Sequence, residues 1–137
     1  TGTADKDEAF DPMFYGYGRG RGTWFIGEVI GQYLVPNSNI NFHQIHAKGT
    51  FTEKLSGGML YYWYQRNENV AGKPGGSKNF AQEIDLYADI KVTDYLSFSL
   101  VYAIATPQAA ATREFTGTNG YANDPYQTAF AIATVSF

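Results

Sequence analysis

Apolar and polar residues alternate most regularly between residues 79 and 92. From Ile84 to Val92 every second side chain is apolar, so these side chains share one face of a β-strand. The opposite face is mostly charged and carries Glu83, Asp85, Asp89 and Lys91. The stretch has the length of a tilted transmembrane strand, which needs roughly 9–11 residues. The pattern therefore predicts a strand with one face toward lipid and the other toward a polar interior.

The same period of two recurs in other parts of the chain. We predict further strands at residues 24–35, 39–51, 55–66, 96–106 and 126–137. Short turns at 52–54 and 93–95 alternate with long loops at 65–78 and 107–125, as periplasmic turns alternate with exterior loops in outer-membrane barrels. The predicted fold class is all-β, an antiparallel transmembrane β-barrel segment of about six strands. It is expected to be part of a larger barrel, because the smallest single-chain bacterial barrels have about eight strands.

These strands fall within residues 23–137, and residues 1–22 are predicted to form a polar, glycine-rich loop segment. The final strand ends on Phe137 and has apolar residues at Ala129, Ala131, Ala133 and Val135. A C-terminal aromatic residue after such a strand is typical of the signal that outer-membrane assembly machinery recognises, so Phe137 is expected to serve this purpose. The absence of an initiating methionine and a signal peptide is expected for a processed chain or a fragment.

The composition agrees with a sheet in an interfacial setting. Tyrosine (11), phenylalanine (10) and glycine (15) are abundant, whereas charged residues make up 17%, below the roughly 25% of ordinary domains. The net charge of -3 argues against nucleic acid as a partner. The chain has no cysteine, which excludes a disulfide scaffold and a thiolate metal site within these residues. No stretch reaches the roughly 18 apolar residues of a transmembrane helix.

Polar and aromatic side chains on the predicted inward faces are the candidates for lining a solute path. These are Glu28, Gln44, His46, Lys48, Tyr62, Tyr64, Arg66, Glu83, Asp85, Asp89 and Lys91. Tyr61 and Trp63 alternate with Tyr62 and Tyr64, and are predicted to belong to an aromatic girdle at the lipid surface. Arg19 and Arg21 are loop candidates for contact with an anionic solute if their segment folds toward the bore; an exposed connector is the alternative.

Catalytic and metal sites are not predicted. His43 and His46 are three residues apart, so on a strand they lie on opposite faces and cannot chelate one ion. Carboxylate pairs such as Glu83 and Asp85 also occur in glycoside hydrolases, but no other catalytic group accompanies them. We therefore expect neither an enzyme nor a cofactor.

Residues 10–137 resemble the C-terminal half of the alginate-export family of outer-membrane barrels. The resemblance rests on short segments: Phe10-Asp11-Pro12-Met13-Phe14-Tyr15-Gly16, Gly27-Glu28, Asn37-Ser38-Asn39, Gln82-Glu83-Ile84-Asp85-Leu86-Tyr87-Ala88-Asp89 and the terminal Phe137. It implies a monomeric, large-bore barrel of well over a dozen strands that moves a polysaccharide or another polar solute. The chain departs from a polyanion exporter because its inward positions carry charges of both signs, rather than mainly arginine and lysine.

The sequence thus predicts a porin-like channel in the outer membrane of a Gram-negative bacterium, for passive transport or export of polar solutes. Its expected partners are the lipid bilayer, polar or charged small solutes or a polysaccharide, and the assembly machinery. Two alternatives remain open at this point. One is a soluble all-β ligand-binding module, and the other is a barrel that forms a sheath around a partner protein.

Overall fold

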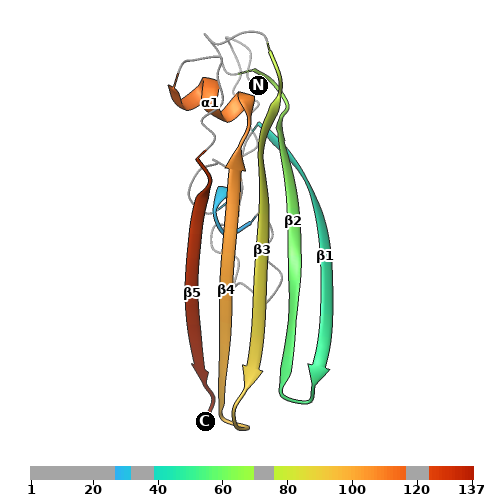
Figure 1. Cartoon of the computed structure of the whole chain (residues 1–137), viewed down its shortest axis with the longest axis vertical. Helices are drawn as coiled ribbons and strands as arrows, with labels where there is room; N and C mark the ends of the chain where they lie inside the picture. The colour runs from blue at the N-terminus through green and yellow to red at the C-terminus, as the bar shows by residue number, and fades with distance from the viewer. Residues whose placement is uncertain (1–26, 32–38, 70–75, 117–123) are drawn as a thin grey trace, which may run out of the picture.

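The computed structural model describes residues 27–31, 39–69, 76–116 and 124–137. It contains five strands and one helix: β1 (Ile40–Thr52), β2 (Leu55–Arg66), β3 (Asn79–Lys91), β4 (Leu96–Pro107), α1 (Ala109–Thr116) and β5 (Tyr126–Val135). The strands form one antiparallel sheet in the order β1-β2-β3-β4-β5, so each strand lies beside its neighbour in sequence (Figure 1). The all-β, antiparallel prediction is confirmed.

The predicted strand bounds agree closely with the five observed strands, but the prediction of a strand at 24–35 is wrong for its described part. Residues 27–31 form a turn, and the described residues contain five strands instead of about six. The reason lies in their hydrogen bonds, because three successive backbone N–H groups of this turn bind carboxylates of β3. Gly27 also has a positive φ of 85°, which an extended strand does not allow.

A helix replaces part of the loop predicted at 107–125. β4 ends at Pro107, and α1 follows almost at once with three alanines, the residue that favours helices most. Gln108 N donates to the Phe80 carbonyl (2.8 Å), which holds the start of the helix against β3. α1 lies at the upper end of the sheet in Figure 1 and contacts β3 and β4.

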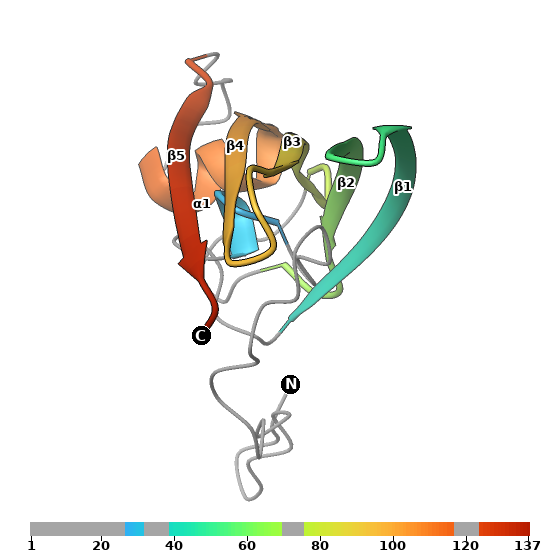
Figure 2. The same cartoon turned by 90° about the horizontal axis from the view of Figure 1, so that it is seen from below.

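The sheet is curved, and its two faces differ. Figure 2 shows residues 27–31 lying in the hollow of the curve, which we call the concave face. Most of the buried hydrophobic cluster lies on this side, where Val29 and Ile30 meet side chains of the sheet such as Leu60, Tyr62 and Ala103. The opposite, convex face carries exposed apolar side chains such as Met59, Leu86 and Leu100.

Both edges of the sheet are open within the described residues. There, β1 pairs only with β2 and β5 pairs only with β4, so the sheet does not close into a barrel. The turns 52–55 and 91–96 lie together at the lower end in Figure 1, where Lys91 N donates to the Lys54 carbonyl (2.8 Å). Across the described ranges, no helix has the length and apolar character needed to cross a membrane.

Candidate solute path on the concave face

Strand alternation and register bring the predicted inward residues of the sheet to one face, as the sequence pattern indicates. Three cross-strand rows illustrate this: Gln44, Tyr62, Glu83 and Ala105; His46, Leu60, Asp85 and Ala103; Lys48, Gly58, Tyr87 and Val101. Arg66 lies farther up this face, and Asp89 and Lys91 lie farther down. Arg19 and Arg21 lie outside the described residues.

Residues 27–31 cross the middle of the concave face, and we call this segment the strap. Val29 N donates to Glu83 Oε1 (2.6 Å), Ile30 N to Glu83 Oε2 (2.8 Å) and Glu28 N to Asp85 Oδ2 (3.2 Å). Glu83 and Asp85 are 1% and 0% exposed, so these carboxylates face the strap instead of open space. Buried carboxylates need such donors, because loss of hydration must be compensated.

The strap fits closely against β2 and β3 at Gly27. A Cβ atom at this position would lie 2.7 Å from Glu83 Oε2 and would also collide with the Tyr64 hydroxyl. Tyr64 itself donates to Glu83 Oε2 (3.3 Å) and stacks on Tyr62, with ring centroids 5.8 Å apart. Glu83 is therefore bonded from both the strap and the sheet. Glu28, which the sequence analysis placed on a strand, is instead a buried residue of the strap.

Above the strap, α1 is fixed to the sheet by an ion pair. The Arg66 guanidinium donates to both oxygens of Glu114, from Nε (3.0 Å) and from Nη2 (2.7 Å). It also lies over the Phe80 ring, 4.3 Å from the centroid. Arg66 thus lies on the concave face with the other candidates, but it is buried and its charge is compensated by Glu114.

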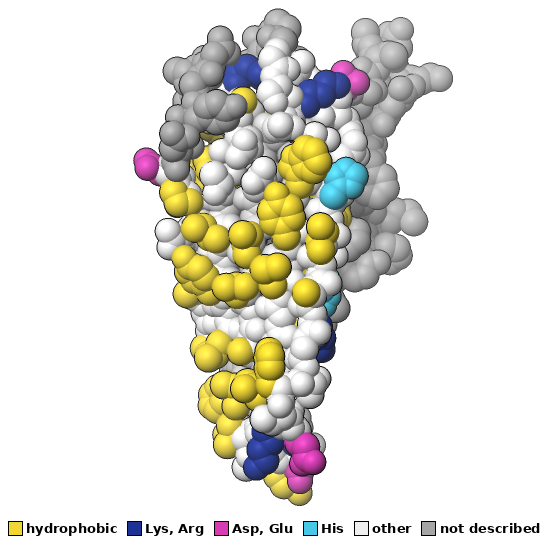
Figure 3. All heavy atoms as spheres, turned by 45° about the vertical axis from the view of Figure 1, so that its right-hand side comes forward, with side chains coloured by type: hydrophobic (Ala, Val, Ile, Leu, Met, Phe, Trp, Pro, Cys, Tyr) yellow, Lys and Arg dark blue, Asp and Glu magenta, His cyan; other side chains and the backbone are white. Residues whose placement is uncertain are grey.

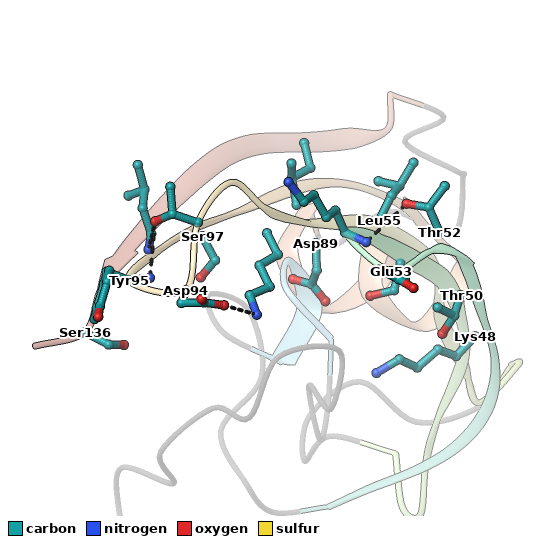
Figure 4. A pocket seen from close by; sticks show the side chains of 16 residues that line it. Lys48, Thr50, Thr52, Glu53, Leu55, Asp89, Asp94, Tyr95, Ser97 and Ser136 are labelled. Atoms are coloured by element: carbon teal, nitrogen blue, oxygen red, sulfur yellow. Dashed lines mark hydrogen bonds and ion pairs between the residues drawn. The ribbon is translucent and has the colours of Figure 1, made fainter.

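Below the strap, the concave face opens into a pocket of about 340 Å³. Side chains of β1 to β4 and of both short turns line it, with Lys48 and Asp89 pointing into the hollow from β1 and β3 (Figure 4). Ser99 donates to Asp89 Oδ1 (2.5 Å). Lys91 pairs with Asp94 (2.7 Å), and this hydrogen bond holds the pKa of the Asp94 carboxyl below its usual range. The pocket presents charges of both signs.

Two further candidates, both on β1, are bonded to the sheet. Gln44 Nε2 donates to the Tyr62 hydroxyl (2.9 Å), and His46 Nε2 lies 2.9 Å from the Tyr87 hydroxyl. His43 lies on the convex face beside Trp63, with ring centroids 6.0 Å apart, so the two histidines point to opposite sides as their spacing indicates. Among the residues that the structure describes, no group of three or more histidine, aspartate or glutamate side chains is placed to hold a metal ion.

No local sequence pattern indicates the residues that fix the strap and the helix. Glu83 and Asp85 were recognised as inward, but nothing in a period of two indicates a partner more than fifty residues away. Glu114 lies in a segment without a strand period, and its pairing with Arg66 depends on α1 folding over the sheet. The one local signal was the glycine at position 27, since glycine often marks a close backbone approach.

The convex face is apolar over successive cross-strand rows. Four rows contain no charged residue: Ile45, Tyr61, Ile84, Ile104 and Gln127; Ala47, Met59, Leu86, Tyr102 and Ala129; Gly49, Gly57, Ala88, Leu100 and Ala131; Leu55, Ile90, Phe98 and Ala133. A fifth row continues on β4 and β5 with Leu96 and Val135. Figure 3 shows hydrophobic side chains gathered over the middle and lower parts of the molecule, with charged side chains mainly toward the ends and margins. Leu86 and Leu100 are each 45% exposed.

Comparison with protein-family models, with curated proteins and with solved structures gives no match for this chain.

Proposed function

We propose that the chain forms part of the wall of an outer-membrane β-barrel channel for polar solutes. The observation that carries this proposal is the convex face, whose exposed apolar rows contain no charge. In water, an apolar surface of this extent would be costly and prone to association. If the same rows faced lipid, their apolar side chains would contact the apolar hydrocarbon chains of the bilayer, while the backbone is hydrogen-bonded within the sheet.

The dimensions of this surface suit a bilayer. Five rows span four steps of two residues, which at about 3.4 Å per residue gives about 27 Å along the strands. Tilting the strands by roughly 40° reduces this height to about 21 Å, close to the roughly 25 Å band of outer-membrane barrels. Trp63 lies just above the rows and Tyr95 just below them, at the levels where girdle residues would enter the interfacial layers.

The other features fit the same role. The concave face would line a hydrated interior, and its charged pocket would select solutes by size and sign without any chemistry. The edges of β1 and β5, which are open within the described residues, would pair with further strands, because the five described strands are too few to close a transmembrane barrel. The resemblance to the alginate-export family points to a large barrel of this kind. The mixed charges of Lys48, Asp89 and Lys91 favour small polar solutes over a polyanion.

Cell fractionation followed by gel analysis tests the proposal. Outer membranes of the source cells would be extracted with detergent, and the protein followed with and without boiling. We expect it in the outer-membrane fraction, with a mobility that changes on boiling and a mass above that of this 15.2 kDa chain. A species of about 15 kDa that is recovered in buffer without detergent would contradict the proposal.

A further inference from the structure

We propose that the strap, residues 27–31, is the constriction of the channel, and that Glu83 is the residue that positions it. This inference rests on the proposed channel function. It assigns Glu83 and Asp85 a different task from Asp89 on the same strand face. Asp89 borders the open pocket, whereas the other two carboxylates bind the backbone of the strap.

The strap lies where it would limit passage. Val29 and Ile30 are 5% and 1% exposed, and they pack into the hydrophobic cluster on the concave face. Above them the Arg66–Glu114 ion pair fixes α1 to the sheet, and below them the pocket is open. A solute that entered from the pocket along the concave face would therefore meet the strap first. Displacement of the strap would widen the path along β2 and β3.

The two carboxylates contribute unequally. Both oxygens of Glu83 accept a strap N–H, and Oε2 also accepts from Tyr64. Only one oxygen of Asp85 accepts from the strap, through Glu28 N, and Asp85 Oδ1 is buried without a hydrogen-bond partner. The strap is thus held mainly by Glu83.

This difference gives a matched pair of substitutions. In Glu83→Gln, one oxygen becomes an NH₂ group that faces a backbone N–H donor, so one strap hydrogen bond is lost and replaced by repulsion. In Asp85→Asn, the amide oxygen can still accept from Glu28 N, and the NH₂ group takes the position of the unpartnered oxygen. We expect Glu83→Gln to release the strap and Asp85→Asn to retain it.

Labelling of a single cysteine would report the position of the strap. The 137 residues contain no cysteine, so Val29→Cys gives a unique thiol within them at a buried strap position. In the full-length folded protein in detergent, a water-soluble maleimide should label this thiol slowly. Adding Glu83→Gln should raise the labelling rate about tenfold or more, the effect of losing one hydrogen bond to a charged group. Asp85→Asn should leave the rate within about twofold, well below the effect of a lost bond.

Single-channel conductance in planar bilayers supplies the second readout, and heat-modifiable mobility confirms that each variant is folded. Glu83→Gln should raise the conductance, and Asp85→Asn should not. Gly27→Ala should displace the strap while leaving Glu83 in place, because the Cβ atom of the new alanine would collide with the side chains of Tyr64 and Glu83. This variant should also raise both the labelling rate and the conductance. It keeps the test decisive if Glu83→Gln does not fold.

The outcomes separate the two proposals. Unchanged labelling in folded Glu83→Gln and Gly27→Ala would overturn the positioning role of Glu83. Increased labelling with unchanged conductance would overturn the strap as the constriction. If the wild-type protein conducts no ions while labelling responds as expected, the channel function fails and the constriction with it, although the attachment of the strap to Glu83 stands.

Discussion

Ionisable residues of the concave face differ in burial, and burial decides what each can do. Arg66, Glu83 and Asp85 are 5%, 1% and 0% exposed, and each is bonded to a partner distant in sequence. Lys48 and Lys91 are exposed beside the pocket, where water can solvate them. A buried charge without a partner is costly, whereas an exposed charge is nearly neutral for stability. The buried set therefore maintains the fold, and the exposed set is available to solutes.

Substitution of one acid in each ion pair tests this distinction. Glu114→Ala leaves the Arg66 guanidinium buried without its carboxylate and should lower the free energy of unfolding by about 2 kcal/mol, less than a fully buried pair because Glu114 is partly exposed. Asp94→Ala removes an exposed pair and should cause no measurable change. Urea titration of the protein refolded in detergent measures both. Equal losses of stability would contradict the argument.

The exposed pair also predicts a simple pH response. Because the pKa of Asp94 is lowered by Lys91, the pair persists above that pKa and is lost as the pH falls through it. The solvent-exposed geometry makes this loss negligible for stability. Urea midpoints of the wild type and of Asp94→Ala should therefore coincide at every pH. A wild-type midpoint that is higher at neutral pH and converges with that of Asp94→Ala as the pH falls through the pKa of Asp94 would show that the pair contributes.

At the scale of elements, the two faces of a strand carry side chains of different polarity. β3 shows this most clearly, with Leu86 on the convex face and Asp85 beside it on the concave face. The effect of a substitution on stability should therefore depend on the face of the sheet that it changes and on its depth in the bilayer. The same arginine that is tolerated near an interface is unfavourable at the centre of a lipid-facing surface.

Two arginine substitutions on the convex face of β3 provide the test. Leu86→Arg lies in the second uncharged row and should cost about 2–4 kcal/mol, whereas Gln82→Arg, above the rows on the same strand, should cost about 0–1 kcal/mol. The fraction of heat-modifiable protein in outer membranes reports assembly of each variant. Equal assembly of the two would contradict the assignment of the convex face to lipid.

At the scale of the whole molecule, the described sheet is an open arc. Its concave side is covered by α1 at the top and by the strap in the middle, and it is open at the pocket below. Both edge strands are long, with 13 residues in β1 and 10 in β5. Unpaired edges of this length are templates for pairing with further strands.

Hydrogen exchange in native membranes can show whether these edges are paired. If neighbouring strands continue the wall, amides of β1 and β5 should exchange as slowly as those of β3, because every N–H would be hydrogen-bonded. If the sheet stands alone, alternate amides of the two edge strands should exchange rapidly. Rapid exchange confined to β1 and β5 would contradict a closed wall.

The sequence by itself determined the strands, the short turns and the side of the sheet on which each strand side chain lies. These features follow from the period of two, which is a local property of an extended backbone, and the prediction therefore held from Ile40 to Val135 wherever a strand formed. The same locality explains why the bounds were accurate to one or two residues. A strand places successive side chains on opposite faces, so the alternation of polar and apolar residues begins and ends where the strand does.

Only the tertiary structure decided that residues 27–31 form a strap, that α1 replaces part of a loop, and which charges are buried. The strap turns because its N–H groups donate hydrogen bonds to Glu83 and Asp85, and α1 is fixed by the ion pair between Glu114 and Arg66. These bonds join residues 48 to 57 positions apart, so no local pattern contains them. Alternation could place a carboxylate on the concave face, but only the folded chain could decide whether it binds backbone or remains open to solvent.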